Sequence, residues 1–106
     1  MSFFNAIKQR YIARKFKKHD WRIIQSIPFL AFEKLIVNYV ENGWEIADDY
    51  RVLNEDAKQW QCSLRKGTSI LVCSWSANEL GNVVGPARPM EGLAAELGLP
   101  VYDKPQ

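Results

Sequence analysis

The sequence predicts a single α+β domain preceded by a basic helix, and three observations support this. Apolar residues repeat at helical spacing over 28–42 and again after Pro89, while two strand-like runs between these stretches flank Lys66-Gly67. The segments between the expected strands are too short for the crossover that a parallel sheet needs. We therefore expect N-terminal helices, an antiparallel meander of three or four strands and a C-terminal helix. The 28–42 helix should pack on one face of the sheet.

Positive charge is concentrated at the start of the chain. Residues 1–22 hold seven Lys and Arg against one Asp, whereas the rest of the chain holds seven against eleven acids. No Gly or Pro occurs between Ser2 and Lys18, so residues 1–20 are expected to form a basic helix and residues 21–106 the single α+β domain. Such an asymmetry indicates either a polyanionic partner or a helix that lies on its own acidic body.

Five bases of this helix are the expected binding residues for an acidic protein or a nucleic acid. They are Arg10, Arg14, Lys15, Lys17 and Lys18. The plainer alternative is a solvated helix face, because the segment contains no recognisable nucleic-acid-reading motif.

Four apolar residues of the same helix fall in one quadrant of a helical wheel, so they are expected to dock on the domain, while Ile12 and Phe16 lie elsewhere on the wheel. The four are Phe3, Phe4, Ile7 and Tyr11. Arg14 and Lys18 continue that stripe, so bases and apolar residues are not segregated as they are in a helix that lies on a membrane surface. Membrane-surface binding is therefore not favoured.

The sequence predicts the secondary structure of residues 21–53 with different degrees of regularity in the apolar pattern. Residues 21–27 alternate partly like a strand, but Asp20 is also a good N-cap, and we interpret 21–27 as a short helix or irregular structure. The 28–42 helix is clear, because its apolar positions follow an i, i+3, i+4, i+7 pattern and "ENG" ends it. Residues 44–53 are expected to form a strand.

A hairpin is the strongest local prediction. With Lys66-Gly67 as a two-residue loop, one face of the two strands is apolar. That face carries Trp60, Cys62, Leu64, Leu71, Cys73 and Trp75. "VVG" is expected to add a short fourth strand, and the last helix is expected to start near Pro89 and to end at Gly98.

No motif carries a catalytic, metal or cofactor signature. His19 is the only histidine, and ten residues separate Cys62 from Cys73 instead of the few that separate zinc ligands. The glycines of "GNVVGPARP" match neither the dinucleotide fingerprint nor the P-loop. We therefore predict no catalytic residue, no bound metal and no cofactor, with both cysteines as inert core thiols.

Two other kinds of site stay open. Asp48 falls on the core side of its strand if alternation holds, so a small-molecule or enzymatic pocket is the alternative to the basic helix. Its residues would be Asp48, Tyr50, Trp60 and Cys62. A β-bulge that turns Asp48 to water is the plainer interpretation. Ile70 and Val72 are apolar on an otherwise polar sheet face, which would suit a homodimer surface.

The bulk properties set the class of protein. A chain of 106 residues can bury a core without a metal or a disulfide framework. Its longest apolar runs, "IPFLAF" and "ILVC", are far below the roughly 18 residues that span a bilayer. We expect a soluble cytoplasmic protein that acts as a small binding or regulatory module and not as an enzyme.

Overall fold

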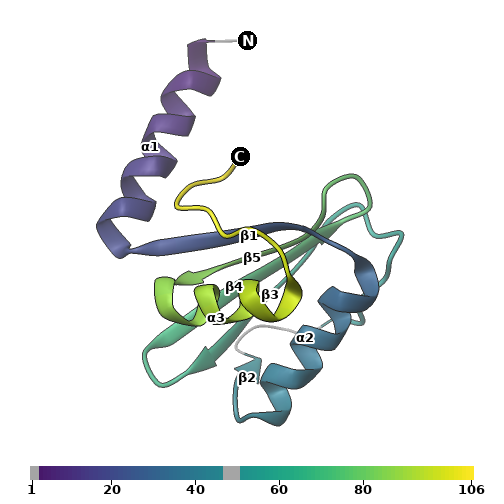
Figure 1. Cartoon of the computed structure of the whole chain (residues 1–106). Coiled ribbons are helices and arrows are strands. Elements are labelled where there is room, and N and C mark those ends of the chain that lie inside the picture. The colour runs from purple at the N-terminus through teal and green to yellow at the C-terminus, as the bar shows by residue number, and fades with distance from the viewer. Residues whose placement is uncertain (1–2, 47–50) are drawn as a thin grey trace.

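The computed structural model describes residues 3–46 and 51–106. For residues 3–7 it describes the helical backbone but not the side chains. Figure 1 shows the order of its elements. They are α1 (Phe3–His19), β1 (Trp21–Ile27), α2 (Phe29–Glu41), β2 (Glu45–Ile46), β3 (Trp60–Lys66), β4 (Ser69–Ser76), β5 (Leu80–Pro86) and α3 (Ala87–Leu97). The strands form one antiparallel sheet in the order β1-β5-β4-β3-β2. The predicted α+β class and antiparallel meander are confirmed, although the sheet has five strands and not three or four.

Helices α2 and α3 cover one face of the sheet and enclose the core between the two layers (Figure 1). Phe32, Leu35 and Ile36 of α2 and Met90, Leu93 and Ala94 of α3 are buried in it. The predicted packing of the 28–42 helix is thus confirmed, with α2 ending one residue inside each predicted boundary. The C-terminal helix begins at Ala87, slightly before the predicted start.

The apolar face predicted for the β3–β4 hairpin is buried as expected, but its register differs. The two loop residues are Gly67 and Thr68, since Lys66 pairs with Ser69 and Leu64 with Leu71. Gly67 has φ 62°, and a two-residue turn of type II′ needs Gly with positive φ at its first central position. The pairing is therefore shifted by two residues, which leaves every side chain on its predicted face.

Residues 21–27 form a strand, so their interpretation as a helix or irregular structure is wrong. Strand β1 pairs with β5, and the register shifts between Ile24 and Ile27, where Ser26 has φ 59°. This irregularity brings Ile24 and Ile27 to the same core despite their odd spacing, and both are fully buried. This bulge explains why residues 21–27 lack the period-2 alternation of a regular strand.

The strand predicted over 44–53 is described in part. Glu45–Ile46 form β2 and residues 51–53 have no regular structure, while residues 47–50 lie outside the described residues. Two tryptophans hold the following loop, because the indole Nε1 of Trp60 donates to the carbonyl of Arg51 at 2.9 Å and that of Trp75 to Glu55 at 3.0 Å. These two side-chain hydrogen bonds tie the loop before β3 to the sheet.

The other face of the sheet is not covered by α2 or α3. Val72 and Val84 lie opposite each other on this second face and are half-buried, while Ile70 is 49% exposed. At its edge the C-terminal segment adds a bridge, in which the backbones of Ile23 and Tyr102 exchange hydrogen bonds of 2.9 Å. A homodimer through Ile70 and Val72 stays a prediction.

Within residues 3–46 and 51–106, none of the helices combines the length and the apolar character needed to cross a bilayer.

Candidate functional site

Helix α1 leaves the domain at the edge of β1 and extends away from the sheet (Figure 1). Its described contact with the domain is near its C-terminal end. Phe16 is 5% exposed and its ring meets that of Trp21 edge-to-face, with 5.6 Å between the ring centroids. Ile12 and Ala13, about one turn earlier, are half-buried. These three residues are the docking face of α1.

The docking face predicted from the sequence can be compared with the structure at Tyr11. Tyr11 was expected to dock, but its side chain is 58% exposed, and the Nζ of Lys15 lies 5.0 Å from its ring centroid. The side chains of Phe3, Phe4 and Ile7 lie outside the described residues. Docking through Ile12, Ala13 and Phe16 turns Tyr11 outward because it lies about 100° from Ile12 around the helix.

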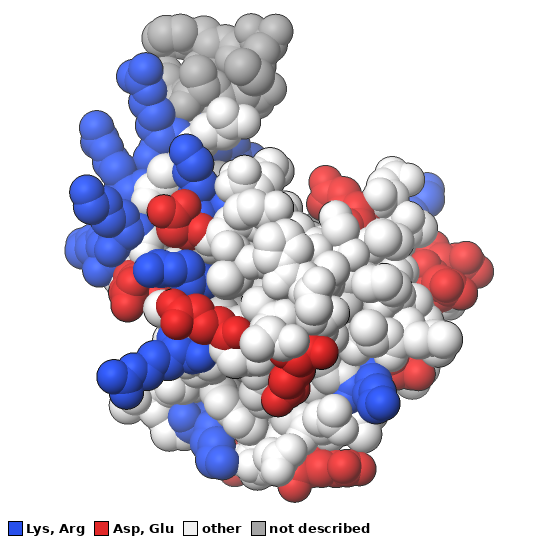
Figure 2. Space-filling model, in the orientation of Figure 1, with Lys and Arg blue, Asp and Glu red and all other residues white. Residues whose placement is uncertain are grey.

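The five predicted binding bases are all exposed, and Lys8 of the same helix is exposed with them. Figure 2 shows blue side chains gathered over α1, with red side chains beside them where the helix meets the domain. At 100° per residue the docking face spans an arc of about 100°, and the six bases fill about 180° on the opposite side. Helix α1 therefore presents a basic surface, with Tyr11 exposed within it, about 15 Å long from Lys8 to Lys18 at 1.5 Å per residue.

Among the described residues, no base of α1 forms an ion pair with an acid of the body, although Lys17 lines a hollow together with Asp20 and Asp103. Among the described residues one ion pair is found, between Arg22 and Asp20 at 3.0 Å, and it involves none of the bases on α1. Part of the charge has a structural explanation, since Lys17, Lys18 and His19 lie in the last turn and stabilise the helix dipole. Arg10 and Arg14 lie too far from that end to share this role.

The alternative pocket stays a prediction, and two of its four residues, Trp60 and Cys62, are described in the structure. Cys62 is fully buried, and Trp60 is 6% exposed and packs edge-to-face on Phe32, with 5.8 Å between the centroids. Both side chains fill the core. Asp48 and Tyr50 lie outside the described residues, so their part in this alternative has no structural description.

The two cysteines lie directly opposite each other on β3 and β4, and both are fully buried and not joined by a disulfide. In the part of the chain that the structure describes, no cluster of three or more His, Cys, Asp or Glu could hold a metal ion. A hydrogen bond with Cys62 and burial raise the pKa of the Cys73 thiol well above its ordinary value.

Alkaline pH is therefore expected to destabilise the fold through Cys73. In the unfolded chain the thiol ionises near pH ~8.5, while in the native state it stays protonated to higher pH. The stabilisation is complete below that pH and is lost as the pH rises, with a slope that approaches about 1.4 kcal/mol per pH unit. Urea unfolding between about pH 7 and 9.5 should show a shallower decline for Cys73→Ala than for the wild type. Parallel declines would contradict the raised pKa.

Sequence reasoning missed a groove between α2 and α3. It is lined by residues such as Leu35 and Tyr39 of α2 and Leu93 and Glu96 of α3. The strands β3 to β5 separate these residues along the chain, so no local spacing could reveal that they meet.

No family model matches the chain, and neither a curated protein nor a solved structure matches it. Function has to be inferred from the fold and from the chemistry of its side chains.

Proposed function

We propose that the protein is a small non-catalytic binding module whose helix α1 contacts an acidic partner, either a nucleic acid or an acidic protein. The observation that carries the proposal is the basic half of α1, where six exposed bases lie outside the docking face. Two of them, Arg10 and Lys17, flank that face and border hollows that the C-terminal segment also lines. Because α1 docks through its C-terminal turns, the opposite half of the helix is accessible along its described length.

The dimensions of this surface suit a polyanion. Double-stranded DNA carries one phosphate charge per about 1.7 Å of axis, so 15 Å of helix can face several phosphates at once. Each base that neutralises a phosphate releases counterions and lowers the slope of log K against log salt by about 0.9. Four to six such contacts produce affinity that depends strongly on salt and has little sequence preference.

Charge reversal of four α1 bases tests the proposal. The variant combines Arg14→Glu, Lys15→Glu, Lys17→Glu and Lys18→Glu, and fluorescence anisotropy follows a labelled 20-nucleotide DNA and, separately, a labelled polyglutamate. We expect wild-type binding to at least one probe and loss of that binding in the variant. If the bound probe is double-stranded DNA, the slope of log K against log salt for the wild type should be about −4 to −5.

A matched control separates the helix from net charge. The combination of Arg51→Glu, Lys58→Glu, Arg65→Glu and Arg88→Glu changes the net charge equally at exposed positions outside α1. This control variant should keep most of the affinity at moderate salt, since the Debye length is about 10 Å at 0.1 M. An equal loss in both variants, or no binding of either probe by the wild type, would contradict the proposal.

A further inference from the structure

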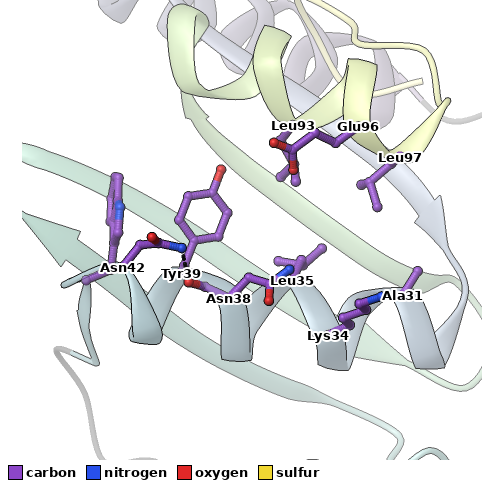
Figure 3. A pocket seen from close by; sticks show the side chains of 10 residues that line it. Ala31, Lys34, Leu35, Asn38, Tyr39, Asn42, Leu93, Glu96 and Leu97 are labelled. Atoms are coloured by element: carbon purple, nitrogen blue, oxygen red, sulfur yellow. Dashed lines mark hydrogen bonds between the residues drawn. The ribbon is translucent and has the colours of Figure 1, made fainter.

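Helices α2 and α3 lie on the same face of the sheet with a groove of about 450 Å³ between them. Figure 3 shows side chains of both helices pointing into it. This volume is within the range of small-molecule sites in proteins, about 300 to 1,000 Å³. None of the bases on α1 borders the groove, so what it binds is independent of the proposed function.

The floor of the groove is apolar. Leu35 is 3% exposed and Leu93 is 4% exposed, and they close its base from opposite helices. Leu97 and Ala31, both half-buried, extend this surface toward one end. A ligand that rests here therefore needs an apolar body.

One end of the groove has an aromatic wall. The rings of Tyr39 and Trp44 meet edge-to-face with 5.2 Å between their centroids. The backbone N–H of Trp44 donates to the carbonyl of Tyr39 at 3.0 Å, which holds the two residues together after the end of α2. Aromatic faces attract organic cations through their quadrupole.

A carboxylate lies across the groove from this wall. Glu96 of α3 lines the groove and is exposed, and the ion pair found among the described residues lies elsewhere. Figure 3 shows the Tyr39 hydroxyl directed toward the side of the groove that carries Glu96. Burial and the charge of Glu96 both raise the pKa of Tyr39, so the tyrosine stays neutral and Glu96 gives this end its negative charge.

We propose that this groove binds a small organic ammonium ion with an apolar body. The ammonium group lies between Glu96 and the aromatic pair of Tyr39 and Trp44, and the body rests on Leu35 and Leu93. Lys34 is the base among the described residues that line the groove, and it lies at the Ala31 end in Figure 3. A second positive charge on the ligand would be directed toward Lys34, so the site selects a monocation.

Three probes of similar shape and different charge test the proposal with the full chain. They are 2-phenylethylammonium, 2-phenylethanol and 3-phenylpropionate, each titrated near neutral pH and followed by amide chemical shifts. We expect saturable binding of the ammonium probe, with shifts in α2 and α3, at an affinity about tenfold above that of the other two. Equal affinities, a preference for the anion, or no saturation at concentrations on the order of 10 mM would overturn the proposal.

Two variants of α3 test whether Glu96 causes the preference for the ammonium probe. Glu96→Gln should lower the affinity for 2-phenylethylammonium about tenfold and leave the weak binding of 2-phenylethanol unchanged. Glu91→Gln is the control, since Glu91 is exposed on the same helix and does not line the groove. An equal loss in both variants would show that net charge and not the site attracts the cation. Thermal unfolding of both variants checks that neither loses the fold.

Discussion

Replacing Phe32 with alanine is expected to lower the free energy of unfolding by about 3 to 5 kcal/mol. Phe32 is fully buried at the centre of the interface between α2 and the sheet. Its ring contacts those of Trp60 and Trp75, with centroid distances of 5.8 and 5.7 Å. The substitution removes aromatic contacts and leaves a cavity that the surrounding sheet can fill only in part. Urea unfolding of the two proteins measures the difference.

The effect should be specific to the buried side of α2. Leu30 is 76% exposed on the same helix, so Leu30→Ala should change the free energy of unfolding by less than about 0.5 kcal/mol. Loss of Phe32 should also loosen the loop at 51–57, because both indoles that hold it pack on this ring. Similar unfolding midpoints for the Phe32 and Leu30 variants would contradict the position of Phe32 in the core.

The predictions that held are those in which burial follows from local periodicity. The apolar ladder of α2 specified both its length and its buried face, and Phe32, Leu35 and Ile36 are buried as expected. The hairpin face was also predicted correctly although the turn was placed one residue early. A shift of two in the pairing conserves the face, so the core composition did not depend on the loop position.

The errors occur where tertiary contacts decide the structure. Strand β1 lacks regular alternation because of its irregularity at Ser26, and only its pairing with β5 reveals it as a strand. The docking face of α1 could not be chosen correctly without that strand, since Phe16 docks on Trp21. Helix α1 has apolar residues on more than one side, and sequence periodicity alone cannot say which side meets the domain.

The two candidate sites, the basic surface of α1 and the groove between α2 and α3, also differ in whether the sequence alone could predict them. The basic surface of α1 could be predicted because its residues are close together in the sequence. The groove could not, because Tyr39 and Glu96 meet only when two helices from different parts of the chain pack on one sheet. Strand β5 is central to that packing, since it pairs with both β1 and β4 and lies under α2.

Replacing Gly81 of β5 with alanine is expected to destabilise the protein by about 1 to 3 kcal/mol. A Cβ atom at this position would lie 2.5 Å from Cδ1 and 2.8 Å from Cγ of Phe32, and 3.1 Å from the carbonyl oxygen of Ile27. Phe32 is fully buried and the oxygen belongs to the backbone of β1, so neither can move away without disturbing the core. Gly81 therefore permits the close approach of α2 to the sheet.

Gly92→Ala is the matched control for this substitution. A Cβ atom at Gly92 meets no atom within 4 Å, and Gly92 lies in the interior of α3, where alanine has the higher helix propensity. Gly92→Ala should therefore stabilise the protein by up to about 1 kcal/mol, so one added methyl group has opposite effects at the two glycines. Urea unfolding of both variants measures this. A Gly81→Ala protein as stable as the wild type would mean that α2 can shift from the sheet at little cost.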